Sequence, residues 1–132
     1  MPPQITGIHH VAIICSDYGQ AKRFYTETLG FPVIAETYRA ERGSYKLDLQ
    51  LPGGPQIELF SFPDTPPRAS RPEACGLRHL ALRVPDIDAA VAAILSAGIE
   101  VEPIRVDPIT GSRFTFFADP DGLPIEFYET EK

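Results

Sequence analysis

The sequence predicts an α+β fold built from two copies of a β-α-β-β-β module within one domain, residues 1–132. Residues 7–14 and 76–83 are similar strand-like runs with a histidine at the same point. Each run is followed by an aspartate, a segment of helical periodicity and three short strand-like segments. Because the whole pattern recurs, we expect a first module at 5–62 and a second at 76–129. A proline-rich linker, 63–75, joins them.

The two expected helices span residues 17–29 and 86–97. Asp17 can cap the first helix, with a capping-box partner three residues on. Gly30 and Gly98 follow the last helical residues and favour termination there. The apolar residues of both segments recur at helical spacing, so we interpret them as core rather than as cofactor contacts.

Three strands are expected after each helix. In the first module they are 33–40, 45–51 and 56–62, and in the second they are 101–106, 113–118 and 124–128. The sequences 52–54 (Pro-Gly-Gly) and 120–122 (Pro-Asp-Gly) separate the last two strands of each module. Both are strong turn sequences, which supports the repeat.

Four polar residues occupy matched positions in the repeat. His10 and Glu58 are 48 positions apart, and His79 and Glu126 are 47 apart. Each module therefore places one histidine near the start of its first strand and one glutamate in its last strand. Because the two spacings match, we treat these four residues as a set, whereas His9 has no histidine counterpart and is left out.

The two glutamates lie inside apolar runs, where an unpaired carboxylate is costly to bury. Two imidazoles and two carboxylates suit Zn²⁺, Ni²⁺, Fe²⁺ or Mn²⁺. Four protein ligands would leave an octahedral ion two positions for water or substrate. The alternative is that each histidine is an ordinary core or surface residue. For a single position that alternative is favoured, but the matched set favours a metal site.

Composition excludes several classes of function. Net charge is −6, which argues against nucleic acid as a main partner. The apolar runs are too short to span a bilayer, and the N-terminus has no basic region followed by an apolar signal core. We therefore expect a globular, cytoplasmic protein without a membrane partner.

Arginine and cysteine leave alternatives open. Four arginines lie close together and two more follow, which indicates either a solvated surface with ion pairs or a pocket for an anionic substrate: Arg68, Arg71, Arg78, Arg83, Arg105 and Arg113. Cys15 ends an apolar strand and is interpreted as core, and Cys75 is the last residue of the linker. No CxxC pair is present, so a thiolate zinc site is not indicated, and a nucleophilic role for either thiol is not favoured.

These motifs resemble the glyoxalase I branch of the vicinal oxygen chelate (VOC) superfamily over nearly the whole chain. The segments that carry the resemblance are 10–13, 24–25, 29–31, 57–59, 79–82 and 119–126. Residues 71–80 and 113–117 are most similar to the YaeR-like group of small bacterial glyoxalase relatives.

The resemblance implies paired modules that form a cupped mixed sheet around one divalent metal ion, Ni, Zn, Co, Fe or Mn. It implies His10, Glu58, His79 and Glu126 as its ligands. In glyoxalase I the modules of two chains pair, which implies a homodimer here, although the sequence leaves open pairing within one chain.

The implied activity is that of lactoylglutathione lyase. This enzyme isomerises the hemithioacetal of methylglyoxal and glutathione through an enediolate. By resemblance Glu126 moves the proton, with Glu58 as its counterpart. Glutathione or another thiol would be the co-substrate.

The sequence departs from the glutathione-dependent pattern at two places. An arginine expected four residues after the first histidine is Ile14, and an asparagine expected after the first glutamate is missing from 60–62. Both changes remove anchors for glutathione. Arg83, at the equivalent place in the second module, is a different candidate anchor, and Arg113 and Phe60 are further candidates for substrate binding.

Other functions on the same scaffold stay open. A ring-cleaving dioxygenase and an antibiotic-inactivating thiol transferase would use three protein ligands, so the fourth counts against both. An epimerase that acts next to a thioester carbonyl needs the same proton transfer. Non-catalytic drug-binding relatives lack the metal residues, all of which are present here.

Overall fold

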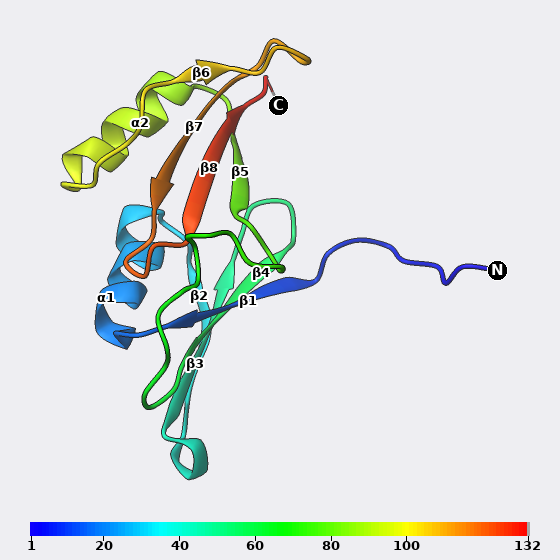
Figure 1. Ribbon diagram of the computed structural model, residues 1–132. Coiled ribbons are helices and arrows are strands. Elements are labelled where there is room, and N and C mark those ends of the chain that lie inside the picture. The colour runs from blue at the N-terminus through cyan, green and yellow to red at the C-terminus, as the bar shows by residue number, and fades with distance from the viewer. Residues whose placement is uncertain (132) are drawn as a thin grey trace. The chain divides into compact units, whose positions relative to one another are not determined.

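The computed structural model describes residues 1–131 and divides into two compact units, 1–66 and a second that begins at Pro67 (Figure 1). Each unit contains a four-stranded mixed sheet and a helix. No helix among residues 1–131 has the length and apolar character needed to cross a membrane. The expected α+β class is confirmed.

The first unit follows the predicted order of elements. Its elements are β1 (His10–Cys15), α1 (Tyr18–Arg23), a π-helical turn (Phe24–Thr28), β2 (Val33–Arg39), a 3-10 turn (Ala40–Arg42), β3 (Ser44–Gln50) and β4 (Gln56–Ser61). The strand order is β1-β4-β3-β2, with β1 parallel to β4 and the other pairs antiparallel. The strand β4 is therefore central, next to the strand that begins with His10.

The second unit repeats this topology. Its elements are β5 (Leu80–Val84), α2 (Ile87–Ser96), β6 (Arg105–Val106), β7 (Arg113–Ala118) and β8 (Pro124–Glu129). The strand order is β5-β8-β7-β6, and only β5 and β8 are parallel. The β-α-β-β-β pattern that the repeat predicts is thus present in both units.

Aspartates begin both helices as expected. The carboxylate of Asp17 accepts a hydrogen bond of 3.0 Å from the backbone N–H of Gln20. Asp86 accepts one of 3.2 Å from the N–H of Ala89. Each bond satisfies a donor of the first turn that has no partner within the helix. The N-cap expected for the first helix is confirmed.

The structure corrects the expected strand at 101–106, since only Arg105–Val106 is a strand. Pro103 has no N–H to donate, which interrupts the ladder. The backbone N–H of Glu102 still donates to the carbonyl of Phe116 at 3.1 Å, so the segment follows β7 without regular pairing.

The first strand of each unit begins later than expected. The strand β1 starts at His10, paired with Gln56, the residue after Pro55. The strand β5 starts at Leu80, paired with Ile125, the residue after Pro124. Because proline has no N–H for a ladder, regular pairing begins just after it. His10 is therefore the first residue of β1, and His79 directly precedes β5.

One face of each sheet is apolar and buried. In the first unit the buried residues come from β1, β3, β4 and the helical segment: Ile13, Cys15, Leu47, Leu49, Ile57, Leu59, Ala21, Phe24 and Tyr25. In the second unit they are Thr115, Phe117, Ile125, Phe127, Ile87 and Ile94. The helix α1 contacts β4, and α2 contacts β8. Since strand side chains alternate, the residues between these positions face the opposite side of each sheet.

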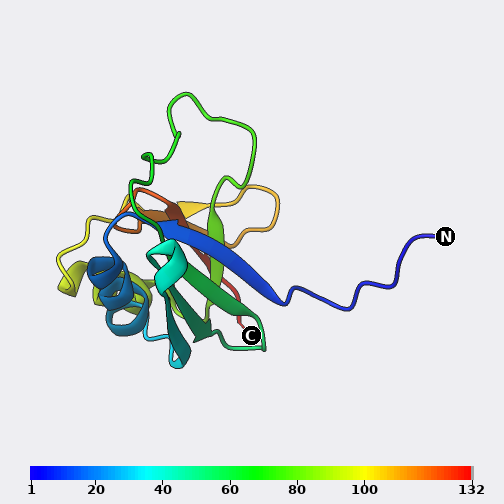
Figure 2. The same ribbon diagram turned by 90° about the horizontal axis from the view of Figure 1, so that it is seen from below.

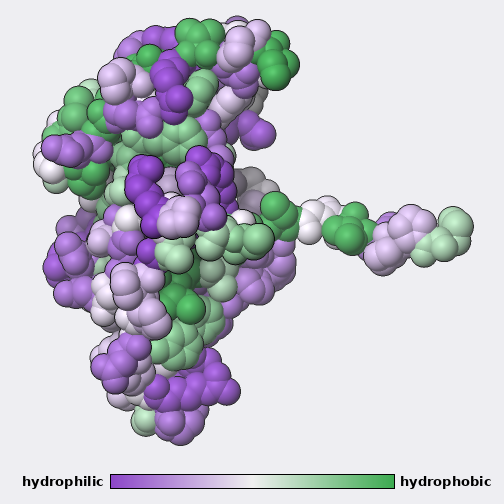
Figure 3. Space-filling view, in the orientation of Figure 1, coloured by the Kyte–Doolittle hydropathy of each residue, from purple (hydrophilic) through white to green (hydrophobic). Residues whose placement is uncertain are grey.

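Two segments lie outside the sheets. The N-terminal arm, residues 1–9, leads away from β1 without regular structure (Figure 2). Its hydrophobic residues are exposed in the space-filling view (Figure 3), and Ile5 and Ile8 retain 79% and 70% of their accessible surface. Residues 62–79 contain no helix or strand.

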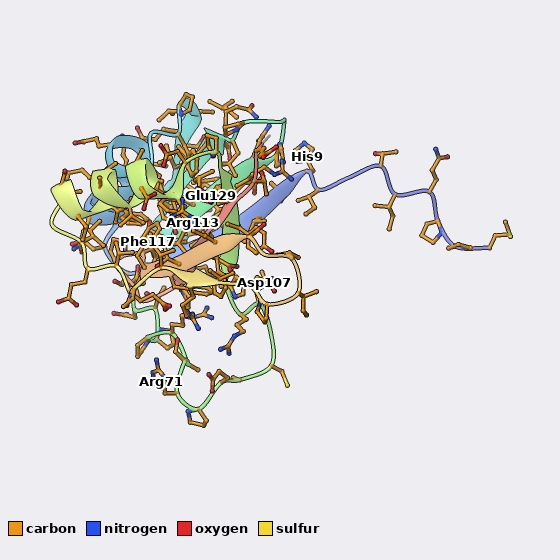
Figure 4. The ribbon with its side chains drawn as sticks, turned by 90° about the horizontal axis from the view of Figure 1, so that it is seen from above. His9, Arg71, Asp107, Arg113, Phe117 and Glu129 are labelled. Carbon is orange, nitrogen blue, oxygen red and sulfur yellow. The ribbon has the colours of Figure 1, made fainter. Side chains whose placement is uncertain are left out.

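An ion pair attaches α2 to the second sheet. The guanidinium of Arg113 makes two hydrogen bonds of 3.0 Å to the carboxylate of Glu129 (Figure 4). Glu129 also accepts a 2.9 Å bond from the N–H of Ile87, at the start of α2. Arg113 reaches Asp88 of the same helix at 3.1 Å. The hydrogen bonds from Arg113, and next the bond from the N–H of Ile87, lower the pKa of Glu129.

Glu129→Gln should lower the Tm at neutral pH, because the amide cannot make two charge-assisted bonds to Arg113. The folded-state pKa lies below an unfolded value of about 4.3. The stabilisation is therefore present above that value and is lost as pH falls through the folded-state pKa. Thermal unfolding should show a larger Tm difference between wild type and variant at neutral pH than at roughly pH 3. The exposed Glu131→Gln is the control. Equal differences at both pH values would contradict the prediction.

Candidate functional site

The first unit brings His10 and Glu58 together on the polar face of its sheet. Glu58 lies in β4 between Ile57 and Leu59, which are buried on the helix side. The Nδ1 atom of His10 lies 3.4 Å from Oε2 of Glu58. Ala12 pairs with Glu58 across the parallel strands and leaves only a methyl group beside the carboxylate.

The second unit repeats the arrangement with His79 and Glu126. Glu126 lies in β8 between the buried residues Ile125 and Phe127. The Nε2 atom of His79 lies 3.1 Å from Oε1 of Glu126. Ala81 is again the small residue paired with the glutamate. Each unit therefore brings together the histidine and glutamate that the repeat singles out.

In both pairs the distance between the histidine nitrogen and the glutamate oxygen suits coordination of a metal ion. Two ligand atoms about 2.1 Å from Zn²⁺ are roughly 3.0 Å apart at a right angle and about 3.4 Å apart at the tetrahedral angle. The observed separations, 3.1 and 3.4 Å, match these values. The glutamate side chains are 15% and 12% exposed, which disfavours a carboxylate without a cationic partner.

Each pair offers two candidate ligands. Within residues 1–131, no group of three or more His, Cys, Asp or Glu side chains is gathered where it could hold a metal ion. That the two pairs share one ion therefore stays a prediction.

Charged residues surround Glu58. Asp48 of β3 lies directly opposite Glu58 in the antiparallel register. The Nζ atom of Lys46 lies 2.9 Å from Asp48 Oδ1 and 4.0 Å from Glu58 Oε2. His9, labelled in Figure 4, places its Nδ1 atom 2.9 Å from Nδ1 of His10, so one of the two rings must donate.

Aromatic residues surround Glu126. Phe116 of β7 lies opposite Glu126 in the register. Its ring meets the ring of His79 edge to face, with centroids 5.0 Å apart. Phe114 follows on the same face, and the guanidinium of Arg105 lies 4.8 Å from the centre of its ring. The two carboxylates therefore have different surroundings.

Tyr128 holds the turn at 107–112 against this face of the second sheet. Its hydroxyl donates to Oδ2 of Asp107 at 3.0 Å and also contacts the hydroxyl of Thr110. The backbone N–H of Ile109 and then the Tyr128 hydroxyl lower the pKa of Asp107. Asp107 therefore helps to organise the turn.

The two candidate arginines lie on opposite faces of the second sheet. Arg83 pairs with Tyr128 and shares the face of His79 by strand alternation. Within residues 1–131 its side chain has no ion-pair or hydrogen-bond partner. Arg113 instead lies on the helix side, bound to Glu129. Substrate binding by Arg113 would require that pair to break, so this role stays a prediction that the geometry does not favour.

Phe60, the third candidate for substrate binding, lies on the polar face of the first sheet with Glu58. The guanidinium of Arg39 lies 5.0 Å from the centre of the Phe60 ring. Phe62 stacks beside it, with ring centroids 6.1 Å apart. The rings and the guanidinium form a platform on which a planar ligand group could stack.

Two arginines of the sequence cluster stabilise the loop before β5. Arg68 donates to the carbonyls of Leu77 and Arg78 at 3.1 and 2.9 Å. Arg78 pairs with Glu73 at 3.2 Å. For these two residues the contacts fit the interpretation of the arginine cluster as a solvated surface with ion pairs.

Comparisons with known proteins agree with this architecture. Residues 7–127 match the family described as the Glyoxalase/Bleomycin resistance protein/Dioxygenase superfamily. The chain belongs to this superfamily. It is 61% identical to the uncharacterized protein YaeR of Escherichia coli over 92% of this chain and 95% of YaeR. It is 32% identical to a 2-epi-5-epi-valiolone epimerase of Actinomyces sp. over 94% of this chain and 79% of the relative.

A solved superfamily structure supports the fold directly. The glyoxalase family protein from Enterococcus faecalis is 51% identical, with a TM-score of 0.87 over 93% of this chain and 97% of that one. The expected resemblance to the superfamily and to YaeR is confirmed. The metal ligands and the substrate stay predictions.

Sequence reasoning missed the surroundings of the two glutamates. Lys46 and Asp48 alternate with the buried Leu47 and Leu49, so their shared face could have been predicted from the strand pattern. Their place next to Glu58 could not, because it depends on the pairing register of β3 with β4. In this superfamily member, register decides which side chains surround each predicted ligand.

His79→Ala should lower divalent metal affinity by more than about 100-fold, because loss of an outer-shell partner alone typically costs 10–100-fold. Competition of Zn²⁺ or Ni²⁺ against a chromogenic chelator would measure the change. Arg78→Ala, at the exposed residue that precedes His79 in the chain, is the matched control and should keep wild-type affinity. Full metal occupancy in His79→Ala would remove this residue from the ligand set.

Proposed function

We propose that the protein is a cytoplasmic, metal-dependent enzyme of glyoxalase I type. In this proposal His10, Glu58, His79 and Glu126 together hold one divalent ion, which Zn²⁺, Ni²⁺, Co²⁺, Fe²⁺ or Mn²⁺ could provide. The observation that carries the proposal is the repeated histidine–glutamate pair, whose nitrogen–oxygen separations of 3.4 and 3.1 Å suit a coordination shell. A homodimer, as in glyoxalase I, is part of the proposal.

The reaction proposed is proton transfer between adjacent carbons of a small oxygen-bearing substrate. The ion would supply Lewis-acid charge that stabilises negative charge on vicinal substrate oxygens in an enediolate. Glu126 is the proposed base, because it faces Phe116 and has no lysine or arginine ion-pair partner within residues 1–131. Glu58 lies 4.0 Å from Lys46, and attraction to this cation favours a carboxylate that stays in place as a ligand. The two glutamates thus take different roles.

The proposed substrate is the hemithioacetal of methylglyoxal with glutathione or another thiol. Ile14 stands where a glutathione-anchoring arginine is expected, so the thiol part must be held differently. Arg83, on the face of His79 and without a partner within residues 1–131, is the proposed anchor. Phe60, under the guanidinium of Arg39, is proposed to contact the apolar part.

A second candidate is epimerisation next to a carbonyl. The relative from Actinomyces named as an epimerase covers 94% of this chain, which favours this candidate over other reactions of the superfamily. An epimerase also needs a base beside a stabilised enolate, so the same residues would serve.

The deciding experiment is the metal content of the purified protein, followed by an assay of the methylglyoxal–glutathione hemithioacetal after addition of Ni²⁺, Zn²⁺, Co²⁺ or Mn²⁺. Formation of lactoylglutathione would support glyoxalase I activity. Bound metal without this product would direct the search to other thiols and to epimerase substrates. Failure to bind any of these metals would refute the proposal.

Glu126→Gln should lower kcat by about 100- to 10,000-fold, because an amide cannot accept the transferred proton. Glu100→Gln, at an exposed carboxylate after α2, is the control and should keep wild-type kcat. Circular dichroism and chelator competition would verify the fold and the metal content of each variant. Wild-type turnover in metal-loaded Glu126→Gln would rule out its role as base.

Arg83→Ala should raise KM by about tenfold with a smaller change in kcat, because loss of one charged hydrogen bond to bound substrate costs roughly 1.5 kcal/mol. Arg83→Lys should recover part of the loss. Steady-state kinetics, on the substrate that the deciding experiment identifies, would measure KM and kcat for both variants. An unchanged KM in Arg83→Ala would assign the anchor elsewhere.

A further inference from the structure

A lysine–aspartate pair lies beside Glu58 on the polar face of the first sheet. The Nζ atom of Lys46 lies 2.9 Å from Oδ1 of Asp48 and donates to Oδ2 at 3.2 Å. The two side chains are 31% and 17% exposed, so the pair is largely removed from solvent. Of the two side chains, Lys46 keeps the larger exposed fraction.

The pair has an electrostatic role towards Glu58. Asp48 and Glu58 are directly opposite each other on neighbouring strands, where two like charges repel. Lys46, 4.0 Å from Glu58, offsets that repulsion. An ammonium has three donors, and the contact to Asp48 does not use all of them. At least one N–H of Lys46 can therefore serve another acceptor.

The strand order of the module does not depend on this pair. In the second unit the same register positions are occupied by Phe114, paired with Tyr128, and Phe116, paired with Glu126. Two aromatic residues there support the same strand order. The lysine and the aspartate are thus a feature of the first unit, beyond what its sheet requires.

We propose that Lys46 binds a carboxylate group of the substrate next to Glu58, and that Asp48 holds the ammonium in position for this contact. The inference rests on the proposed metal site, because it concerns the part of a metal-bound substrate that lies next to Glu58. Lys46 is a compact point charge on a flexible stem, so it can reach a carboxylate oxygen while it keeps one bond to Asp48. The substrate class that fits is a carbonyl or hydroxy compound that bears a carboxylate, and in the proposed hemithioacetal the glutathione part carries such groups.

Two chelating probes separate this role from a structural one. Oxalate binds a metal through one oxygen of each carboxylate and retains two charged oxygens for a further contact. Acetohydroxamate binds through its two oxygens and carries only a methyl group beyond them. Titration calorimetry on the Zn²⁺- or Ni²⁺-loaded protein gives a dissociation constant for each probe.

In Lys46→Met the dissociation constant of oxalate should rise by at least tenfold, whereas that of acetohydroxamate should change by less than about threefold. Lys46→Arg should keep most of the oxalate affinity. Lys46→Gln removes the charge but keeps a donor for Asp48. It should show the same loss of oxalate affinity, and it replaces Lys46→Met as the test if that variant does not fold.

Metal affinity, measured by chelator competition, distinguishes the outcomes. It is determined for each variant, because Lys46 lies 4.0 Å from Glu58, so that each probe is titrated into fully metal-loaded protein. Equal weakening of both probes, or unchanged oxalate binding in Lys46→Met and Lys46→Gln, would overturn the inference alone. Absence of metal binding by the wild-type protein would overturn the metal site and this inference together.

Discussion

The alternation of side chains along β4 and β8 governs the rest of the molecule. In each strand the residues on either side of the glutamate are apolar and buried on the helix side, so the glutamate must face the other way. A slip of one residue would bury the carboxylate and expose the apolar residues. The packing that stabilises each sheet therefore also orients Glu58 and Glu126.

The same constraint brings each histidine to its glutamate. The strands β1 and β5 are parallel to β4 and β8, and the residue paired with each glutamate is an alanine. The histidine two residues before that alanine shares its face. With only methyl groups between them, imidazole and carboxylate approach to 3.4 and 3.1 Å. A larger side chain at Ala12 or Ala81 would lie against the glutamate that is paired with it.

The repeat preserves this framework and varies what surrounds it. Glu58 faces Asp48 and is close to Lys46, whereas Glu126 faces Phe116. A carboxylate among charges and a carboxylate beside aromatic rings differ in the partners that can neutralise them. Two copies of one module thus present the same histidine–glutamate pair in two different surroundings.

Part of the second unit departs from the repeat for a local reason. The segment expected as a six-residue strand is reduced to Arg105–Val106, because Pro103 cannot donate to the ladder. Pro103 is present in the sequence, but the symmetry of the repeat predicts a full strand there. Arg113 is a second case: the arginine cluster allows a substrate anchor, whereas strand alternation and the contact with Asp88 place Arg113 on the helix side.

The sequence by itself determined the module order, the N-cap of the first helix and the four matched residues, because strand and helix periods and short capping motifs are local properties of a chain. It also determined which face each glutamate takes, since that follows from the apolar residues on either side of it. Only the tertiary structure decided which side chains lie next to each glutamate. That Lys46 and Asp48 surround one and Phe116 the other depends on the register between strands separated along the chain, and register is set by packing and turns rather than by any local motif.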